Sequence, residues 1–232
     1  MPAAVVLFSG GQDSTTCLHL AIQRHGAGNV VAVSVQYGQR HATELAAAAD
    51  ITRAAGVGHV TLETSIFAQL ADSALVSPGD ITEDGGRQDE EAPGGLPTSF
   101  VPGRNMVLLA FASTIAVKYG ARMIYTGVCQ TDFSGYPDCR RVFIDAMQDA
   151  ATLAMPSSCG PLEIVTPLMR QTKADTVRLA KGLGAECWEA LGRSVTCYHG
   201  KRPGCGKCPA CVLRMRGFAE AGEIDPATTQ KA

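Results

Sequence analysis

Residues 5–16 read VVLFSGGQDSTT, and this stretch decides how the chain folds. An apolar run stops abruptly at Ser9-Gly10-Gly11, and a helix-like stretch follows it. This order predicts a buried strand that turns through a glycine corner into the start of a helix. Free backbone N–H groups and the helix dipole favour an anion at such a helix start, and glycines let the backbone approach it closely. The stretch therefore predicts a phosphate site at the beginning of the sequence.

Composition narrows the class of protein further. The chain has 232 residues, of which 46% are hydrophobic and 18% charged, and its formal net charge is −2. These values predict one domain, or one domain with a small appendage, and give no overall attraction to nucleic acid. No secretory signal is visible, and the longest apolar stretch, residues 106–117, is far shorter than the ~20 residues of a membrane span. We therefore expect a cytoplasmic protein, and we expect basic residues such as Lys207, Arg214 and Arg216 to be solvated.

Strand-like and helix-like segments alternate along the chain. Beyond the first strand and helix, we expect strands over residues 30–36, 59–63, 122–126 and 162–166, and helices over residues 41–55, 102–118, 141–155 and 172–183. Thr172 and Asp175 have the spacing of a capping box, and Gly184 is the expected stop of that last helix. This alternation predicts an α/β fold with a doubly wound, mainly parallel sheet, which binds ligands at the carboxyl ends of its strands.

Four cysteines are clustered near the end of the sequence. Cys205, Cys208 and Cys211 follow a CxxCxxC spacing, and Cys197 can fold back across the intervening loop. Four thiolates suit a tetrahedral zinc ion, and a site with no open position would be structural. An iron–sulfur cluster on three thiols, or His199 in place of Cys197, are the alternatives.

Two further segments have the composition of binding loops. Residues 127–140, GVCQTDFSGYPDCR, follow a predicted strand and are dense in side-chain donors and acceptors. There Asp132 and Asp138 are candidates to read the N–H groups of a purine-like base, with Tyr136 stacking on it. Arg104, at a predicted helix start, is a candidate to meet a phosphate or a carboxylate.

The sequence divides into three parts. We expect a phosphate-binding α/β domain over residues 1–190, a four-cysteine segment packed on it over residues 191–222, and a frayed tail over residues 223–232. Residues 77–98 are rich in glycine, proline and acidic residues, and are either a lid or an insertion without a role.

The motifs resemble a known family when they are taken together. Ser-Gly-Gly-x-Asp-Ser at residues 9–14 resembles the PP-loop of ATP pyrophosphatases, which cleave ATP between the α and β phosphates; no lysine follows Gly11 as a Walker A loop requires. With YGQRH at 37–41, VPGRN at 101–105, TDFSGYPDCR at 131–140 and the cysteine cluster, the chain is similar to the 7-cyano-7-deazaguanine synthase family of the queuosine-precursor pathway.

The resemblance implies a fold, an activity and a set of site residues. The fold is that of the adenine-nucleotide α-hydrolases, and the activity is that of a carbon–nitrogen ligase that converts 7-carboxy-7-deazaguanine and ammonia to the nitrile, releasing AMP and pyrophosphate. It implies a homodimer that uses ATP with Mg²⁺ and one structural zinc ion per chain on the four cysteines. The expected ATP-binding residues are Phe8, Ser9, Gly10, Gly11, Gln12, Asp13, Ser14, Thr15, Thr16, Cys17 and Leu18. The expected catalytic residues are Asp13, Ser14, Arg104 and Lys173, and the expected substrate-binding residues are Arg104, Asp132, Ser134, Tyr136 and Asp138.

Two other functions remain open from the sequence. A PP-loop enzyme that modifies tRNA, of the thiolation or lysidine type, would explain the same loop, with Cys129 as its reactive thiol. A zinc-ribbon module that binds nucleic acid or a protein would explain the cysteine cluster but would leave the glycine corner without a role.

Overall fold

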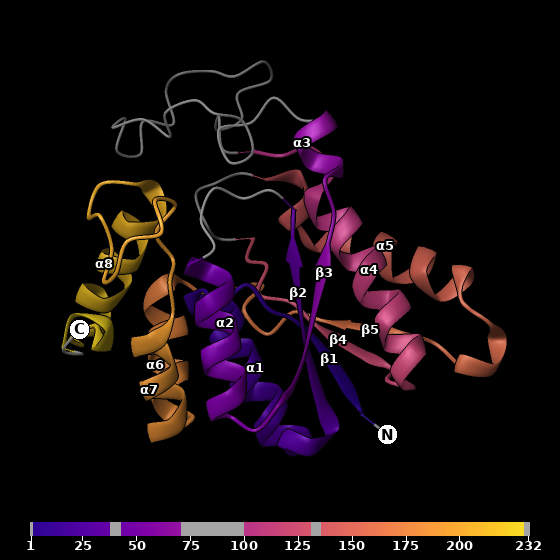
Figure 1. Ribbon diagram of the computed structural model, residues 1–232, viewed down its shortest axis with the longest axis horizontal. Coiled ribbons are helices and arrows are strands. Elements are labelled where there is room, and N and C mark those ends of the chain that lie inside the picture. Colours follow the sequence, from indigo (N-terminus) through magenta and orange to yellow (C-terminus); the bar gives the residue numbers. More distant parts are fainter. Residues whose placement is uncertain (1, 38–42, 71–99, 131–135, 230–232) are drawn as a thin grey trace.

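A five-stranded parallel sheet forms the centre of the molecule (Figure 1). The computed structural model describes residues 2–37, 43–70, 100–130 and 136–229. The strands are β1 (Ala4–Leu7), β2 (Val30–Gln36), β3 (Gly58–Glu63), β4 (Met123–Tyr125) and β5 (Glu163–Val165). Their order is β3-β2-β1-β4-β5, and Ala4 of β1 pairs with Val30 on one side and Met123 on the other. The strand order therefore reverses direction between β1 and β4, which is where such sheets bind ligands.

Helices cover both faces of the sheet. They are α1 (Gln12–His25), α2 (Thr43–Ala54), α3 (Ile66–Leu70), α4 (Arg104–Tyr119), α5 (Arg141–Ala154), α6 (Lys173–Gly182), α7 (Ala185–Arg193), α8 (Pro209–Ala221) and α9 (Pro226–Thr229). Short 3₁₀ turns lie at Ala27–Asn29, Pro137–Cys139 and Ser157–Cys159. No described helix has both the length and the apolar character that crossing a membrane requires. The predicted doubly wound α/β fold is confirmed.

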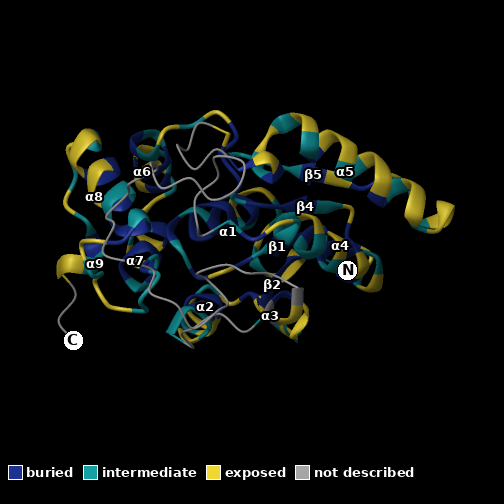
Figure 2. Ribbon diagram, turned by 90° about the horizontal axis from the view of Figure 1, so that it is seen from above, coloured by how far each residue is buried: buried dark blue, intermediate teal, exposed yellow. Residues whose placement is uncertain are grey.

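The core follows from the alternation of side chains along the central strand. Val5 points to the face covered by α4 and α5, where it packs in one cluster with Leu109 and Ile144. Val6 points to the opposite face and packs with Leu18 of α1 and Ile51 of α2. Figure 2 shows buried residues concentrated in the strands and on the sides of the helices that face them. Burial on both faces explains why β1 and β2 read as continuous apolar runs.

Local signals explain several helix ends. Thr172 and Asp175 form the predicted capping box at the start of α6. The predicted helix over residues 102–118 begins two residues later, at Arg104, because Gly103 has a left-handed φ of 71° and ends the preceding turn. Gly184 does not simply stop α6, which ends at Gly182, because α7 begins directly after this glycine.

The end of the chain differs from the prediction. The sequence predicts a frayed tail over residues 223–232, yet α9 lies within them and Asp225 forms an ion pair with the buried side chain of Arg214. Arg214 is therefore part of the interior and not of a solvated basic surface. A buried arginine needs a carboxylate partner, and the sequence after residue 222 supplies it.

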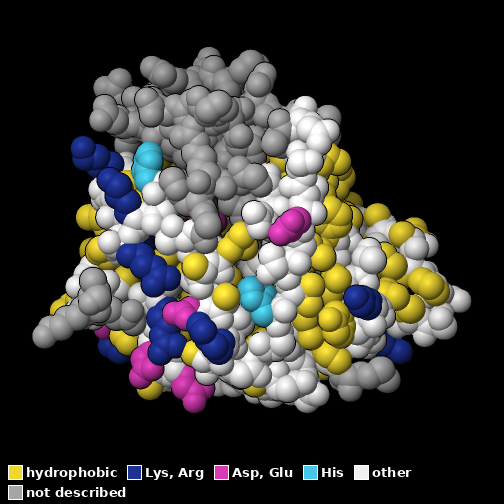
Figure 3. Space-filling model, in the orientation of Figure 1, with side chains coloured by type: hydrophobic (Ala, Val, Ile, Leu, Met, Phe, Trp, Pro, Cys, Tyr) yellow, Lys and Arg dark blue, Asp and Glu magenta, His cyan; other side chains and the backbone are white. Residues whose placement is uncertain are grey.

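Basic side chains on the face drawn in Figure 3 lie mostly on the side of α6, α7 and α8, and the lower ones are interspersed with acidic side chains. Lys181 pairs with Glu223 at 2.5 Å and Arg178 pairs with Asp175 at 3.0 Å. Paired charges of this kind make this part of the surface of α6 mixed in sign.

Helix α8 packs closely on the start of α6, and this contact generates a test of the fold. A Cβ atom on Gly217 would lie 2.7 Å from Cβ of Lys173 and 3.1 Å from its carbonyl carbon. We predict that Gly217→Ala destabilises the protein by roughly 1–3 kcal/mol, because the backbones must move apart. Gly182→Ala is the matched control, since a Cβ there would meet nothing within 4 Å and alanine favours the helix. Denaturant unfolding of both variants measures the difference, and equal stabilities would contradict close packing at Gly217.

Candidate active site

The glycine corner between β1 and α1 is a braced loop. The Ser9 and Ser14 hydroxyls lie 3.1 Å apart, and Ser14 Oγ donates to the carbonyl of Gly11 at 3.0 Å. The backbone N–H of Gly11 donates to Ser9 Oγ at 3.3 Å. Gly10 has a φ of 80°, and a Cβ there would lie 2.7 Å from the carbonyl oxygen of Glu44 in α2. Only glycine fits this close approach, so α2 packs directly against the loop.

A cavity of about 370 Å³ opens beside this loop, at the carboxyl ends of β1, β2 and β4. The predicted site residues that line it are Phe8, Ser9, Gly11, Gln12, Asp13, Ser14, Arg104, Tyr136 and Lys173. The other five predicted nucleotide-binding residues do not line it and are buried: Gly10, Thr15, Thr16, Cys17 and Leu18. The structure therefore brings the loop between β1 and α1 together with Arg104 and Lys173, which are far from it in the sequence.

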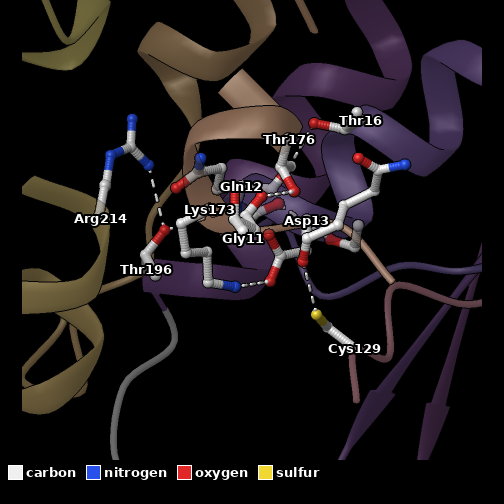
Figure 4. Close-up of polar contacts among 12 residues, drawn as sticks. Gly11, Gln12, Asp13, Thr16, Cys129, Lys173, Thr176, Thr196 and Arg214 are labelled. Carbon is white, nitrogen blue, oxygen red and sulfur yellow. Dashed lines mark hydrogen bonds and ion pairs between the residues drawn. The ribbon is translucent and has the colours of Figure 1, made fainter. Parts of the chain in front are cut away.

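Lys173 and Asp13 meet at the first turn of α1 (Figure 4). Lys173 Nζ donates to Asp13 Oδ2 at 2.6 Å, and both side chains are largely buried. Lys173 is the first residue of α6, and the Thr172 cap fixes where that helix starts. The other carboxylate oxygen, Asp13 Oδ1, is buried and has no hydrogen-bond partner among the described residues. One oxygen therefore holds the lysine while the second remains for another cation.

Arg104 also lines the cavity and lies among aromatic side chains. Burial opposes its charge, yet its pKa is raised because Tyr37, Tyr136 and Tyr198 surround it, with Asp138 nearby. Burial also raises the pKa of the Tyr198 phenol. A guanidinium held in such a pocket stays charged and is available to an anionic group.

Glu44 also lines this cavity, and sequence reasoning missed it. Burial raises the pKa of its carboxyl group from 4.5 to about 7, and the charge of Arg104 opposes that rise. The signal that could have found it is its position, three residues beyond the YGQRH segment, in the first turn of a predicted helix.

Of the residues predicted to bind the base, only some can be placed at the cavity. Asp132 and Ser134 lie outside the described residues. Tyr136 lines the cavity and packs against Phe100, with ring centroids 5.3 Å apart. Asp138 does not line the cavity: it is buried, and its Oδ2 accepts a hydrogen bond from the backbone N–H of Asn105 at 3.1 Å. It supports the start of α4 and through it the position of Arg104.

The four predicted metal ligands come together. The sulfur atoms of Cys197, Cys205, Cys208 and Cys211 all lie within 4.8 Å of one another, and those of Cys205 and Cys211 are 3.9 Å apart. Tetrahedral zinc with bonds of about 2.3 Å would separate its sulfur ligands by a little under 4 Å, so the cluster fits such an ion. A Cβ on Gly204 would lie 2.9 Å from the sulfur of Cys211, which explains the glycine there. The cluster can hold a metal ion, with Cys197 as the fourth member.

Fold and site together define an α/β protein with a glycine-rich loop beside a cavity at the switch point of its sheet and a separate cysteine cluster. Residues 3–222 match the family described as Queuosine biosynthesis protein QueC, and the chain belongs to this family. The resemblance inferred from the sequence motifs is confirmed.

Relatives with known names are similar over almost the whole chain. A 7-cyano-7-deazaguanine synthase of Chromobacterium violaceum is 50% identical over 223 residues, which are 96% of this chain and 92% of that protein. A protein of the same name from Laribacter hongkongensis is 49% identical, over 96% of this chain and 93% of its own. Among solved structures, a predicted subunit of a tRNA methyltransferase from Methanocaldococcus jannaschii has a TM-score of 0.48 and 15% identity, and the match covers 78% of this chain and 75% of that one.

The raised pKa of Glu44 predicts how the stability of the ligand-free protein depends on pH. The folded state holds the Glu44 proton more tightly than the unfolded chain, so this group makes the protein less stable as pH rises from about 4.5 to about 7. Glutamine cannot ionise, so Glu44→Gln should gain stability relative to the parent protein across this window and keep the gain above it.

Urea unfolding of the ligand-free proteins at a series of pH values measures the difference. Glu63→Gln, at an exposed carboxyl group, gives the background effect of removing any acidic side chain. A stability difference for Glu44→Gln that does not change with pH would contradict the assignment.

Proposed function

We propose that this protein converts 7-carboxy-7-deazaguanine and ammonia to 7-cyano-7-deazaguanine, using ATP and releasing AMP and pyrophosphate. The observation that carries the proposal is the braced loop at the start of α1, which faces a cavity together with Lys173 and Arg104. Membership of the family and the names of similar proteins indicate the substrate that is adenylated, the carboxylated deazaguanine.

The chemistry explains why one loop serves the whole reaction. A carboxylate is a poor acyl donor because its oxide is a poor leaving group. Attack of the carboxylate on the α-phosphorus of ATP forms an acyl adenylate and releases pyrophosphate; ammonia then displaces AMP and leaves a primary amide. A second adenylation, on the amide oxygen, again releases pyrophosphate, and loss of AMP and protons from nitrogen gives the nitrile. Each adenylation uses one ATP molecule, and the same loop would bind the phosphates of both in turn.

The side chains around the loop have distinct parts in this scheme. The hydroxyls of Ser9 and Ser14 and the free N–H groups of the α1 start would bind the phosphates. Lys173 and Arg104 would stabilise the negative charge that develops at phosphorus, and Arg104 is also placed to meet the substrate carboxylate. Asp13 Oδ1 would hold Mg²⁺, because a hard cation takes carboxylate and phosphate oxygens together. When bound, that ion neutralises charge on the phosphates.

Recognition of the deazapurine involves a different set of residues. A guanine-like edge presents adjacent N–H donors, which a carboxylate can accept. Glu44 lines the cavity and has this chemistry, whereas Asp138 does not line it and its Oδ2 accepts from the N–H of Asn105. We assign base reading to Glu44, with Tyr136 as a stacking surface, and retain Asp132 and Ser134 as candidates from the motif.

We further propose that the four cysteines bind one structural zinc ion and that the chain acts as a homodimer in the cytoplasm. A closed set of four thiolates leaves no position for substrate, so the ion would fix the chain ahead of α8. The resemblance to the family supports the homodimer, and exposed apolar side chains of α5, Val142 and Leu153, offer a surface for it.

Removing one cysteine tests the zinc assignment. Cys208→Ser should lose zinc and unfold at a lower temperature, because the remaining ligands hold the ion poorly. Cys159→Ser, outside the cluster, should keep one zinc per chain. Elemental analysis of the purified proteins gives the metal and its amount. Iron with visible absorbance, or full zinc content in Cys208→Ser, would contradict the assignment.

Product analysis tests the activity itself. Incubation with ATP, Mg²⁺, ammonium and 7-carboxy-7-deazaguanine should give the nitrile, AMP and pyrophosphate by mass spectrometry. Cys129 also lines the cavity, as a thiol of a tRNA-thiolating enzyme would. The Cys129→Ser variant should keep nitrile formation, since no step uses this thiol. Turnover that required tRNA and a sulfur donor, and that failed in Cys129→Ser, would overturn the proposal in favour of tRNA modification.

A further inference from the structure

Arg214 connects the residues after α8 to the loop between β1 and α1, which is the proposed phosphate site. It lies in α8, is 4% exposed, and forms a two-point ion pair with Asp225, with N···O distances of 2.6 and 2.8 Å. Its other N–H groups donate to the Leu191 carbonyl at 2.9 Å, to Ser194 Oγ at 2.7 Å and to Thr196 Oγ1 at 3.1 Å. All five N–H donors of the guanidinium are therefore used, and its position is fixed.

Thr196 joins this arginine to the start of α1, as Figure 4 shows. Its Oγ1 accepts a hydrogen bond from Arg214 Nη1 at 3.1 Å and a longer one from the backbone N–H of Gln12 at 3.4 Å. The neighbouring residue, Val195, donates its N–H to the carbonyl of Gly10 at 3.0 Å. The segment around Thr196 is thus bound to the phosphate loop by backbone and side chain together.

These two contacts determine which hydrogen bond the Thr196 hydroxyl can still form. A hydroxyl has two acceptor lone pairs and one proton, and both lone pairs of Thr196 are occupied. The proton has no acceptor among the described residues, while Thr196 lines the cavity. A donor that is fixed in orientation at the rim of a phosphate loop fits an anionic oxygen.

We propose that Thr196 donates its hydroxyl proton to a phosphate oxygen of the pyrophosphate part of bound ATP, with Arg214 as its positioning residue. The N–H of Gln12 is one of the donors at the start of α1 that have no acceptor within the helix, and Thr196 Oγ1 accepts from it. Thr196 then supplies a donor of its own, from a segment 184 residues further along the chain. This inference rests on the use of ATP in the proposed function and concerns how the phosphates are bound.

Calorimetry with magnesium pyrophosphate, with AMP and with α,β-methylene ATP tests the donor, because none of these needs deazaguanine or ammonia. Thr196→Val should weaken binding of pyrophosphate and of the ATP analogue roughly tenfold or more and leave AMP binding within about twofold, as expected for one hydrogen bond to a charged group. Thr196→Ser keeps the hydroxyl and should bind like the parent protein. Thr196→Ala serves as a second deletion of the hydroxyl in case valine disturbs folding.

Ser194→Ala is the matched control, because it removes a contact of Arg214 and keeps the Thr196 hydroxyl. Ser194 accepts from the same guanidinium and does not line the cavity, so Ser194→Ala should weaken pyrophosphate binding clearly less than Thr196→Val. Metal content and melting temperature are measured for each variant, since Cys197 is adjacent to Thr196. An affinity loss in Ser194→Ala as large as in Thr196→Val, or no loss in Thr196→Val, would overturn the role of Thr196.

A double-mutant cycle tests the positioning role of Arg214. Arg214→Lys keeps the positive charge and loses the fixed set of donors, so it should weaken pyrophosphate binding. If Arg214 acts through Thr196, adding Arg214→Lys to Thr196→Val should cause no further loss. Additive losses would refute that role, because an arginine that only stabilises the fold affects affinity independently of Thr196.

The outcome separates this inference from the proposed function. A parent protein that binds none of the three ligands would refute ATP use and the inference together. A parent protein that binds them, with a Thr196→Val variant that binds equally well, would refute the inference alone.

Discussion

The backbone at Gly10 is held from two sides, and the rest of the site depends on this constraint. The first turn of α2 approaches so closely that a Cβ would lie 2.7 Å from the carbonyl of Glu44, while the Gly10 carbonyl accepts from Val195 at 3.0 Å. A loop that binds phosphate through backbone N–H groups needs a fixed shape, because misplaced donors lose most of their electrostatic effect. Packing from α2 and from the segment after α7 fixes that shape before any ligand arrives.

Cations around the cavity are placed without leaving unpaired charge in the interior. Lys173 is held by Asp13, Arg214 by Asp225, and Arg104 by its aromatic neighbours and Asp138. Buried charges without partners would be strongly destabilising, so each cation has a local counterpart. The two pairs differ in what they leave available: Asp13 Oδ1 has no hydrogen-bond partner among the described residues, whereas every donor of Arg214 is already used.

Sequence reasoning succeeded where a local pattern specifies a local structure. Apolar runs gave the strands, Thr172 and Asp175 gave the start of α6, and the cysteine spacing gave the cluster. It failed for Asp225, whose polar surroundings suggest a frayed end but whose carboxylate is needed by a buried arginine. It also missed Glu44, because only the packing of α2 on Gly10 brings that carboxyl group to the cavity.

The contact between Thr196 and Gln12 also constrains how the protein is made. The loop leaves the ribosome well before the residues that complete it, because Thr196 lies 184 residues after Gln12 and Asp225 follows later still. Chains grow at about 5–20 residues per second, so the loop is synthesised on the order of ten seconds or more before the residues that contact it. A nascent chain that does not yet include Val195 and Thr196 therefore lacks the contacts that hold the loop at Gly10 and Gln12.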